Sequence, residues 1–438
     1  MSNDGSSRFP QSRLTRFLKV GSLTTKVGAS YLGQKVRAAV VSRESAAASL
    51  VRANVRNAER MARTMGELKG AIMKVGQMLS LQADVLPKEI TDILSGLQQD
   101  APAVSFSSIR RQVEEQLGRP VEACFAEFHT EPHSSASIGQ VHRAVTRDGR
   151  KVVVKIQYPG VDRTIESDFK NLKVLFRALG QVRPKENVES LFQELRQRLV
   201  EELDYELEAR NLREFRELFA GERRVIIPEP VEELSAKAVL TMEYVGGWRA
   251  DDLCAPGVSQ HRRDYFGSLM GELIMRQFFE LRMLHADPNL ANFAFTPDDR
   301  LVMYDFGCVK RFPDAFVKSY AAVVRAALDG CFGRIGDDLR TLGFYDPEGT
   351  VIEQSIIKEF GDVLLPPWTS ERPYDWGKSD IHNELSMLAL RYWKTFLSYV
   401  VPPDIIFFDR VLVGMYGNLR KLGAATLWPS LLRRYLPS

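Results

Sequence analysis

The sequence predicts an α+β fold of two lobes, a small lobe of mixed strands and helices followed by a larger, mostly helical lobe. Hydrophobic residues alternate with the period of β-strands over residues 138–144 and 151–157, and the Asp148-Gly149 pair between them is typical of a hairpin turn. The second half of the chain has the hydrophobic period of helices almost throughout. Only residues 287–307 interrupt this period, with polar residues around a short strand-like run.

Further helices and strands are predicted from local signals along the chain. Residues 105–117 predict a helix with Ser105 or Ser107 as its N-cap and Gly118 as its stop. The other expected elements are helices over 13–97, 161–179 and 188–219 and strands over 225–227 and 238–243. The predicted domains are a basic, partly disordered region over 1–60, a helical extension over 61–130, the mixed lobe over 131–245 and the helical lobe over 246–438.

The composition is that of a soluble globular protein, with one basic region. The 438 residues are 45% hydrophobic and 26% charged, and the net charge is only +3, so no nucleic-acid partner is expected. Residues 1–60 carry eleven Lys and Arg against three acidic residues. This excess predicts either a tether to an anionic membrane surface or, equally, a solvated helix face.

Cysteine usage and hydropathy bear on the compartment. The four cysteines are far apart and form no C-x-x-C pair, so neither a zinc site nor a disulfide framework is expected, and a reducing compartment follows. No run of 18 apolar residues predicts a transmembrane helix. We expect a cytoplasmic protein, with any contact to an inner membrane being peripheral. The Arg- and Ser-rich start leaves organellar targeting open.

The segment from His285 to Gly307 carries the strongest chemical signal. Asp287 and Asn292 lie in an H-x-D-x-x-x-x-N pattern, and Asp305 begins an Asp-Phe-Gly triplet after a strand-like run. A protein-kinase catalytic loop and its D-F-G motif follow each other in this order. Asp287 is therefore the candidate acceptor-side carboxylate, and Asn292 and Asp305 are candidate Mg²⁺ ligands beside ATP or ADP. The predicted fold is accordingly protein-kinase-like, with a helical N-terminal extension.

The small lobe supplies candidate phosphate-binding groups. Lys155 ends a run of three valines, as the lysine that reaches the α- and β-phosphates does in kinases. The segment before it would cover the phosphates through Ala136, Ser137, Gly139 and Val141. It has one glycine where a kinase loop has three, so we expect a stiffer loop that handles nucleotide differently from a signalling kinase.

Two further segments complete the candidate nucleotide site. Met242, Glu243 and Val245 lie where the hinge between kinase lobes would contact adenine, although a plain core strand entering a turn would read similarly. An acidic helix over residues 201–211 offers one carboxylate to pair with Lys155. On one continuous helix, Glu202 would share a face with Tyr205, Glu206 and Ala209, and Asp204 would share another with Glu208.

Together these motifs resemble the UbiB/AarF-domain (ADCK-type) atypical kinase family. The family's K-x-G-Q hallmark matches Lys74-Val-Gly-Gln77, and its E-x-D matches Glu202-Leu-Asp204. The resemblance covers about residues 61–311. It implies that Glu208 positions Lys155, and that Lys74 and Gln77 gate the pocket together with the E-x-D carboxylates.

The resemblance also implies a function: ATP bound with Mg²⁺ between two lobes, then hydrolysed or used on a small lipid-like substrate of the isoprenoid or ubiquinone pathway. Proteins of a biosynthetic complex and an isoprenoid lipid are the implied partners. The residues themselves also argue against a protein substrate. A helix predicted over 314–328 leaves little room after Gly307 for the activation segment on which a protein kinase docks its peptide.

Two alternatives stay open. One is a nucleotide-binding pseudokinase that acts as a scaffold for a biosynthetic complex. The other is a small-molecule phosphotransferase of the aminoglycoside- or choline-kinase kind, which shares the H-x-D-x-x-x-x-N pattern but not the K-x-G-Q block. Metal-dependent turnover would separate the enzymes from the scaffold, whereas nucleotide binding alone would not.

Overall fold

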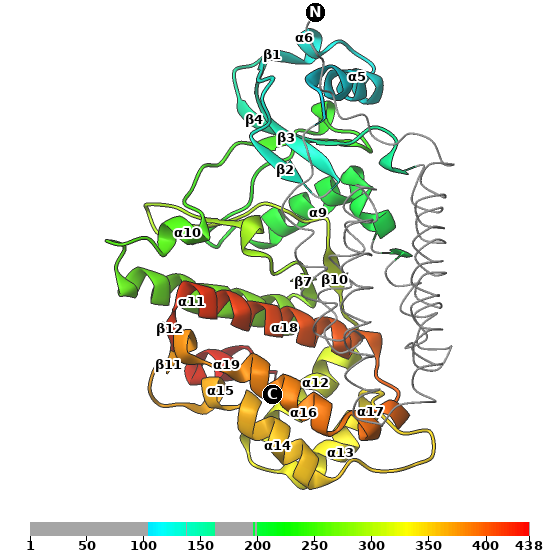
Figure 1. Ribbon diagram of the computed structural model, residues 1–438, viewed down its shortest axis with the longest axis vertical. Helices are drawn as coiled ribbons and strands as arrows, with labels where there is room; N and C mark the ends of the chain where they lie inside the picture. The colour runs from blue at the N-terminus through cyan, green and yellow to red at the C-terminus, as the bar shows by residue number, and fades with distance from the viewer. Residues whose placement is uncertain (1–103, 137, 163–195, 198, 438) are drawn as a thin grey trace, which may run out of the picture. The chain divides into compact units, whose positions relative to one another are not determined.

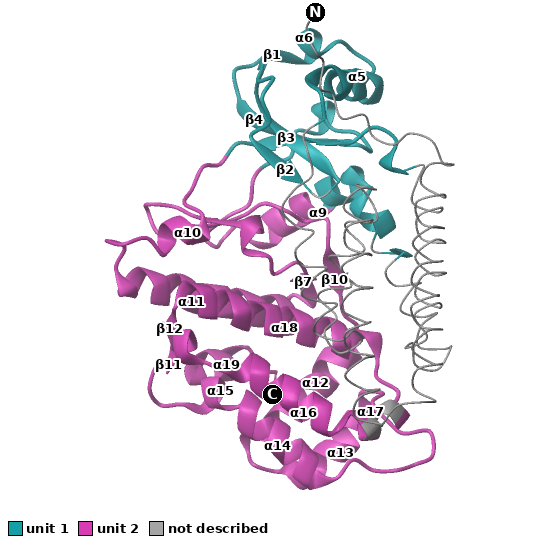
Figure 2. Ribbon diagram, viewed as in Figure 1, with its two compact units in different colours: residues 1–210, 229–244 teal, residues 211–228, 245–438 magenta. Residues whose placement is uncertain are grey.

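The structure is a computed structural model that describes residues 104–136, 138–162, 196–197 and 199–437 (Figure 1). The chain divides into two compact units (Figure 2). Unit 1 comprises Met1–Arg210 and Glu229–Tyr244, and unit 2 comprises Asn211–Pro228 and Val245–Ser438. The basic region over 1–60 and the helix predicted over 13–97 lie outside the described residues, as do residues 163–195. The predicted domain bounds therefore stay predictions.

An antiparallel sheet forms the centre of unit 1. Its main path runs β1-β3-β4-β6, and β2 pairs with β3 at one side. The strands are β1 (Phe125–Phe128), β2 (Ser134–Ala136), β3 (Gly139–Thr146), β4 (Lys151–Gln157) and β6 (Val239–Glu243). Strand β4 is buried at Val152, Val153, Val154 and Ile156, which explains why apolar residues surround Lys155 on both sides in the sequence. The turn between β3 and β4 has Gly149 at φ 87°, so the hairpin predicted at Asp148-Gly149 is confirmed.

Helix α5 (Phe106–Leu117) packs against β4 and β6 through its apolar face, where Ile109 and Val113 are buried. Ser105 is its N-cap residue, and Gly118 ends it in the left-handed conformation at φ 65°. The predicted bounds are thus confirmed. Two shorter helices also lie in this unit, the four-residue α6 (Val121–Cys124) and the 3₁₀ helix η2 (Glu232–Leu234).

The helix predicted as continuous from 188 to 219 is wrong at one point. Described residues up to Glu202 are helical, but Leu203 and Asp204 break the helix, and α9 (Tyr205–Leu218) begins after them. Asp204 causes the new start, because its carboxylate accepts a hydrogen bond from the backbone N–H of Leu207 at 2.9 Å. This is an N-cap interaction, in which the aspartate side chain accepts a hydrogen bond from a backbone N–H of the first turn that has no carbonyl partner within the helix. Glu202 therefore does not share a helix face with Glu206.

Small two- and three-stranded sheets lie in unit 2. Strand β7 (Met283–His285) pairs antiparallel with β10 (Val309–Arg311). In the other sheet, β9 (Leu301–Met303) lies between β8 (Phe293–Phe295), which is antiparallel to it, and β5 (Val225–Ile226), which is parallel. The strands predicted over 225–227 and 238–243 are confirmed within a residue. These pairings place the chain's polar loops next to one another.

Helices make up most of the rest of unit 2. They are α10 (Ala250–Leu253), α11 (Gln260–Met275), α12 (Asp314–Leu328), α13 (Phe332–Thr341), α14 (Gln354–Leu364), α15 (Pro366–Thr369), α16 (Ile381–Arg391), α17 (Trp393–Ser398), α18 (Pro403–Leu422) and α19 (Pro429–Tyr435). Short elements are the π-helix η3 (Arg276–Glu280), the 3₁₀ helices η4 (Leu290–Asn292) and η5 (Trp376–Lys378), and the pair β11 (Tyr374–Asp375) and β12 (Ala425–Thr426). Helix α12 has the bounds that the sequence predicts.

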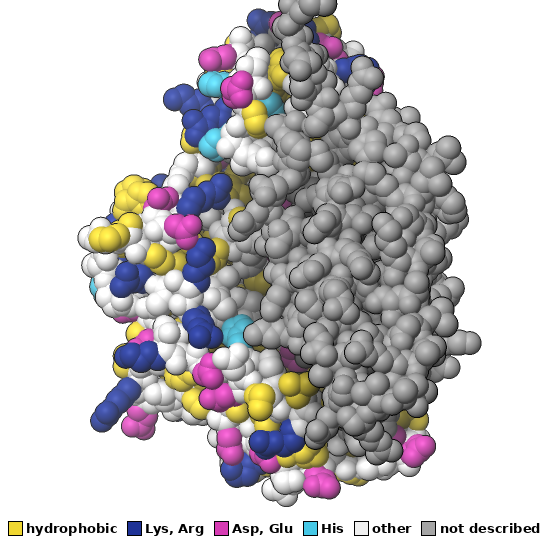
Figure 3. All heavy atoms as spheres, viewed as in Figure 1, with side chains coloured by type: hydrophobic (Ala, Val, Ile, Leu, Met, Phe, Trp, Pro, Cys, Tyr) yellow, Lys and Arg dark blue, Asp and Glu magenta, His cyan; other side chains and the backbone are white. Residues whose placement is uncertain are grey.

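The long helices α11 and α18 lie side by side in the core of unit 2 (Figure 1). Phe278, just beyond α11, stacks on Phe408 of α18 with ring centroids 3.7 Å apart. Within the described residues, no helix is long and apolar enough to cross a membrane. On the face seen in Figure 3, Lys and Arg side chains are interspersed with Asp and Glu.

Candidate functional site

A buried ion pair marks the centre of the candidate site in unit 1. Lys155 Nζ lies 2.8 and 2.9 Å from the two carboxylate oxygens of Glu208. The Lys155 side chain is 11% exposed and that of Glu208 is 2% exposed. The same ammonium lies 4.9 Å from the ring centroid of Tyr205. The structure therefore brings together the lysine and one of the carboxylates that the sequence offers it.

The segment expected to cover phosphates is a tight β-hairpin. Ala136 pairs with Gly139, and Ser137, which lies between them, is outside the described residues. Val141 lies directly opposite Lys155 in the sheet, so their side chains share a face. Gly139 has a structural reason to be glycine, because a Cβ there would clash with the backbone of Ile156 on the neighbouring strand.

The E-x-D carboxylates have different surroundings. Asp204 caps α9, as described above, and its side chain is partly buried. Glu202 is also partly buried, in the last helical turn before the break. Lys74 and Gln77 lie outside the described residues. The gating role of all four residues stays a prediction.

The hinge candidates divide between the two units. Met242 is buried on β6, and the N–H of exposed Glu243 donates to the carbonyl of Glu229 at 2.8 Å. Val245 belongs to unit 2, where its carbonyl accepts a hydrogen bond from the Tyr304 hydroxyl at 2.8 Å. Their contact with adenine stays a prediction.

Strand pairing in unit 2 brings the two polar loops together. Asp287 and Asn292 lie between β7 and β8, and Asp305 lies between β9 and β10. Strand β7 pairs with β10, and β8 pairs with β9. Both loops therefore run between the same two strand pairs and lie next to each other. The backbone N–H of Tyr304 donates to the carbonyl of Asn292 at 3.0 Å, which joins the loops directly beside Asp305.

His285 ties the loops together a second time. Its Nε2 donates a hydrogen bond to the carbonyl of Asp305, and its backbone N–H donates to Gln277 Oε1 at 2.7 Å. Donation to a carbonyl requires the proton on Nε2. Burial lowers the pKa of His285, although Asp287 and Asp305 act in the opposite direction. A neutral His285 thus holds the backbone of the metal-ligand candidate.

Helix α9 and the loop itself fix the Asp305-Phe306-Gly307 triplet. The Asp305 carboxylate accepts the backbone N–H of Gly307 at 3.0 Å. Asn211 donates to the carbonyl of Phe306 at 3.0 Å, and the Phe215 and Phe306 ring centroids are 4.8 Å apart. Hydrogen bonds therefore fix the backbone of the triplet, and packing against Phe215 fixes the Phe306 ring.

The donor chemistry of this loop pair suits Mg²⁺. The Asn292 amide N donates to the carbonyl of Asp287 at 3.4 Å, an orientation that commits the nitrogen and leaves the amide oxygen to serve as a cation ligand. Asp305 adds a carboxylate. Among the described residues, no group of three or more His, Cys, Asp or Glu could hold a metal ion. Two protein ligands are nevertheless enough for Mg²⁺ that is also bound by phosphates and water.

The chain leaves the D-F-G triplet without a long activation segment. Strand β10 follows at Val309–Arg311, and α12 begins at Asp314. The short connection that the sequence predicts is confirmed.

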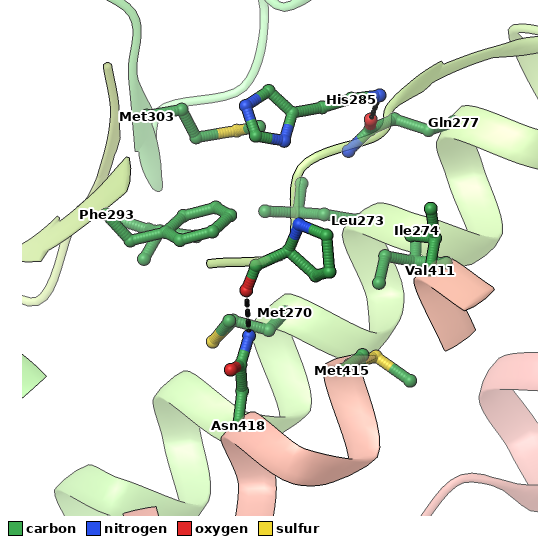
Figure 4. Close-up of a pocket in the computed structure, with 12 residues that line it drawn as sticks. Met270, Leu273, Ile274, Gln277, His285, Phe293, Met303, Val411, Met415 and Asn418 are labelled. Atoms are coloured by element: carbon green, nitrogen blue, oxygen red, sulfur yellow. Dashed lines mark hydrogen bonds between the residues drawn. The ribbon is translucent and has the colours of Figure 1, made fainter. Parts of the chain in front are cut away.

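The sequence did not identify two residues, Gln277 and Asn418, that hold the backbone of the loop around Asp287. Gln277 projects from the π-helical end of α11 to His285, and Asn418 of α18 donates to the carbonyl of Pro288 (Figure 4). Both side chains line a small cavity. No local pattern identifies them, although a glycine inside a helix, such as Gly414 or Gly417 in α18, is the kind of residue that marks a close packing contact.

The sequence matches the family model of the ABC1 atypical kinase-like domain over residues 96–335. A rat protein named atypical kinase COQ8B, mitochondrial, is 32% identical over 87% of this chain and 72% of its own length. A fission yeast protein (Schizosaccharomyces pombe) named atypical kinase COQ8, mitochondrial, is 31% identical over 98% of this chain and 71% of its own.

Two more comparisons extend the likeness. The nematode Caenorhabditis elegans protein named atypical kinase coq-8, mitochondrial, is 34% identical over 84% of this chain, which spans only 49% of that protein's length. A solved structure titled as the complex of Rv3197 with erythromycin from Mycobacterium tuberculosis has a TM-score of 0.64 and 28% identity. The match covers 90% of this chain and 99% of that one.

Proposed function

Because this chain belongs to the UbiB family of ABC1-type atypical kinases, we propose that it is an ATP- and Mg²⁺-dependent phosphotransferase or ATPase. The observation that carries the proposal is the joining of two loops in unit 2 through His285 and Asp305. It groups an acceptor-side carboxylate, Asp287, with the ligand pair Asn292 and Asp305. A purely structural loop pair has no need of this set.

Each residue has a role that follows from its chemistry. Lys155 binds the α- and β-phosphates, and Glu208 holds the ammonium in place. Asn292 and Asp305 hold Mg²⁺, and Asp287 orients or takes the proton of the acceptor hydroxyl or water. When bound, ATP would supply the transferable γ-phosphoryl group, and Mg²⁺ would neutralise the negative charge that develops on it. Ala136, Ser137, Gly139 and Val141 cover the phosphates, while Met242, Glu243 and Val245 contact the base.

A small substrate is favoured over a protein substrate. Protein kinases use an ordered activation segment to dock a peptide, and here α12 begins seven residues after Gly307 at Asp314. Several relatives carry COQ8 in their names, which supports a lipid-like substrate of the isoprenoid or ubiquinone pathway. We propose peripheral contact with an anionic membrane through residues 1–60, with Lys74, Gln77, Glu202 and Asp204 gating access to the nucleotide. The mitochondrial names of those relatives favour an organellar location.

ADP release by the purified full chain, with and without vesicles that contain an anionic phospholipid, tests this function. We expect Mg²⁺-dependent turnover that vesicles stimulate, and a stimulation that falls with salt because charge screening weakens the membrane contact. Removal of Mg²⁺ with a chelator should abolish turnover. ATP binding without turnover in every condition would contradict the proposal and favour the scaffold.

A further inference from the structure

We propose that Asn418 is a positioning residue for the catalytic loop, and that α18 is the platform on which this loop is set. The inference rests on the proposed function, because it assigns Asn418 to the placement of Asp287 and Asn292. Asn418 lies far along the chain from both residues and outside the matched family domain over 96–335.

The first observation is a direct bond between the helix and the loop. The side-chain amide of Asn418 donates a hydrogen bond to the carbonyl of Pro288, the residue after Asp287 (Figure 4). Proline has no N–H, and its ring fixes φ, so this carbonyl is the one backbone hydrogen-bonding group through which the residue can be held. A bond at this point constrains the peptide next to the Asp287 side chain.

The second observation is a close approach of the α18 backbone to the ring of Pro288, one turn before Asn418. A Cβ built on Gly414 would overlap the ring of Pro288, with the proline Cβ 3.1 Å away. Only glycine lets α18 lie this close to the loop without moving it. Gly414 and Asn418 are four residues apart, so they present one helix face to Pro288.

The third observation is incomplete packing beneath the loop. Pro288 and Asn418 line a cavity of about 20 Å³, which is room for one water molecule. Its other walls are mainly apolar, including Met270, Phe293 and Met415 (Figure 4). Side chains therefore leave a small space beside Pro288, and the Asn418 amide lies at its edge.

The loop transmits this placement to the reacting groups through its own hydrogen bonds. The N–H of Asn289 donates to the Asp287 carboxylate at 3.2 Å, and Asn292 donates to the Asp287 carbonyl at 3.4 Å. Asn289 in turn accepts the N–H of Ala291 on its side chain at 3.0 Å. Pro288 lies within this set, so a shift of its carbonyl moves both Asp287 and Asn292.

The start of α18 makes a matching contact with the other polar loop. Asp404 lies 2.6 Å from Lys310 Nζ, on the strand that follows the D-F-G triplet, and both side chains are about a quarter exposed. One rigid helix thus contacts both segments that flank Asp287 and Asp305. This is the arrangement that accurate placement of catalytic groups requires.

The test compares Asn418→Ala and Asn418→Asp with wild type in the full chain. The aspartate keeps the shape of the side chain but cannot donate to the carbonyl, so it stays informative if the alanine variant misfolds. Lys421→Ala is the matched control. Lys421 lies on the same helix as Asn418, and its loss removes an exposed ion pair with Asp251 of α10. Two quantities are measured: kcat and affinity for Mg²⁺-ATP, and backbone hydrogen exchange over 285–292 and over α13.

We expect kcat to fall about 10- to 100-fold in both Asn418 variants, as a small displacement of catalytic groups does, with a weaker affinity for Mg²⁺-ATP because Asn292 moves too, and with the control unchanged. Exchange should rise over 285–292 and not over α13. Unchanged loop exchange, a rise throughout unit 2, or a looser loop with normal kcat would each overturn the inference. If wild type has no turnover but the variants loosen the loop alone, the loop attachment stands and the proposed function fails.

Discussion

Lys155 and Glu208 form a two-pronged ion pair inside unit 1, although 53 residues separate them in the chain. The lysine comes from the central strand β4 and the glutamate from the first turns of α9. Removing two charges from water is costly, and removing one partner leaves the other buried and uncompensated. A pair in this setting is poorly explained by stability alone, which supports the proposed role of Lys155 in binding phosphate oxygens.

Replacing either partner should weaken nucleotide binding. Lys155→Met removes the ammonium proposed to bind phosphate, and Glu208→Gln removes the carboxylate charge that holds this ammonium in place. We expect the dissociation constant for ATP to rise about tenfold or more in each variant, as loss of a charge-assisted contact does. Titration calorimetry measures the effect.

Lys358→Met is the control for this experiment. It breaks an exposed pair with Asp362 on α14, which contributes little. Equal ATP affinity in wild type and Lys155→Met would reduce Lys155 to a strand residue that neutralises Glu208.

The sequence was a good guide to local elements and to motif residues. Helix α12 and strand β4 have the predicted bounds, because amphipathic period and turn residues are local signals. The partner of Lys155 could be restricted to the acidic segment over residues 201–211, because kinases pair this lysine with a glutamate on a helix. The break before α9 was missed because helical spacing continues across it, although an aspartate at 204 is a known N-cap type.

Long-range support could not be predicted. Asn418 is 130 residues from Pro288. Gly414 signals that α18 packs closely on some element, but no local pattern identifies Pro288 as the partner. Gln277 reaches His285 from the π-helix that follows α11, a local deviation that hydrophobic period does not encode.

Asp305→Asn should abolish the Mg²⁺ dependence of nucleotide binding. The amide keeps the shape of the side chain but loses the charge that a hard divalent cation requires. We expect ATP affinity in this variant to be the same with Mg²⁺ and with a chelator. Asp337→Asn, on the exposed face of α13, serves as the charge-matched control. Wild-type Mg²⁺ dependence in Asp305→Asn would refute the metal assignment.

Gly139→Ala should distort the hairpin that precedes Lys155. The added Cβ would meet the backbone of Ile156, with its carbonyl carbon only 3.0 Å away, so a strand must move. We expect a loss of unfolding free energy of about 1–3 kcal/mol, as overpacking produces. Gly221→Ala is the control, because a Cβ there meets nothing within 4 Å. Thermal melting that is equal in the two variants would show that β3 and β4 can separate without cost.

Acid should weaken unit 2 through Glu222. Its hydrogen bond with Arg224, which also binds Glu272, lowers the Glu222 pKa from 4.5 to about 2. A lowered folded-state pKa stabilises the fold above pH 4.5, and that contribution is lost as pH falls from 4.5 towards 2. Because Arg224 is 38% exposed, we expect this contribution to be on the order of 1–2 kcal/mol.

Melting temperatures of wild type and Glu222→Gln at pH 7 and pH 3 measure this contribution. The variant should melt lower at pH 7 and show a smaller difference from wild type at pH 3. A constant difference between the two proteins would show that Glu222 acts through packing and not through its charge.

The most direct test of the account is the rate of Mg²⁺-dependent ADP formation by the full chain in wild type and in Asp287→Asn, measured at saturating ATP. In the proposed mechanism Asp287 acts on the acceptor and not on the nucleotide, so its loss should lower kcat about 100-fold or more while ATP affinity stays unchanged. Equal rates in the two proteins, or no metal-dependent rate in wild type, would contradict the assignment of this loop as a site of phosphoryl transfer.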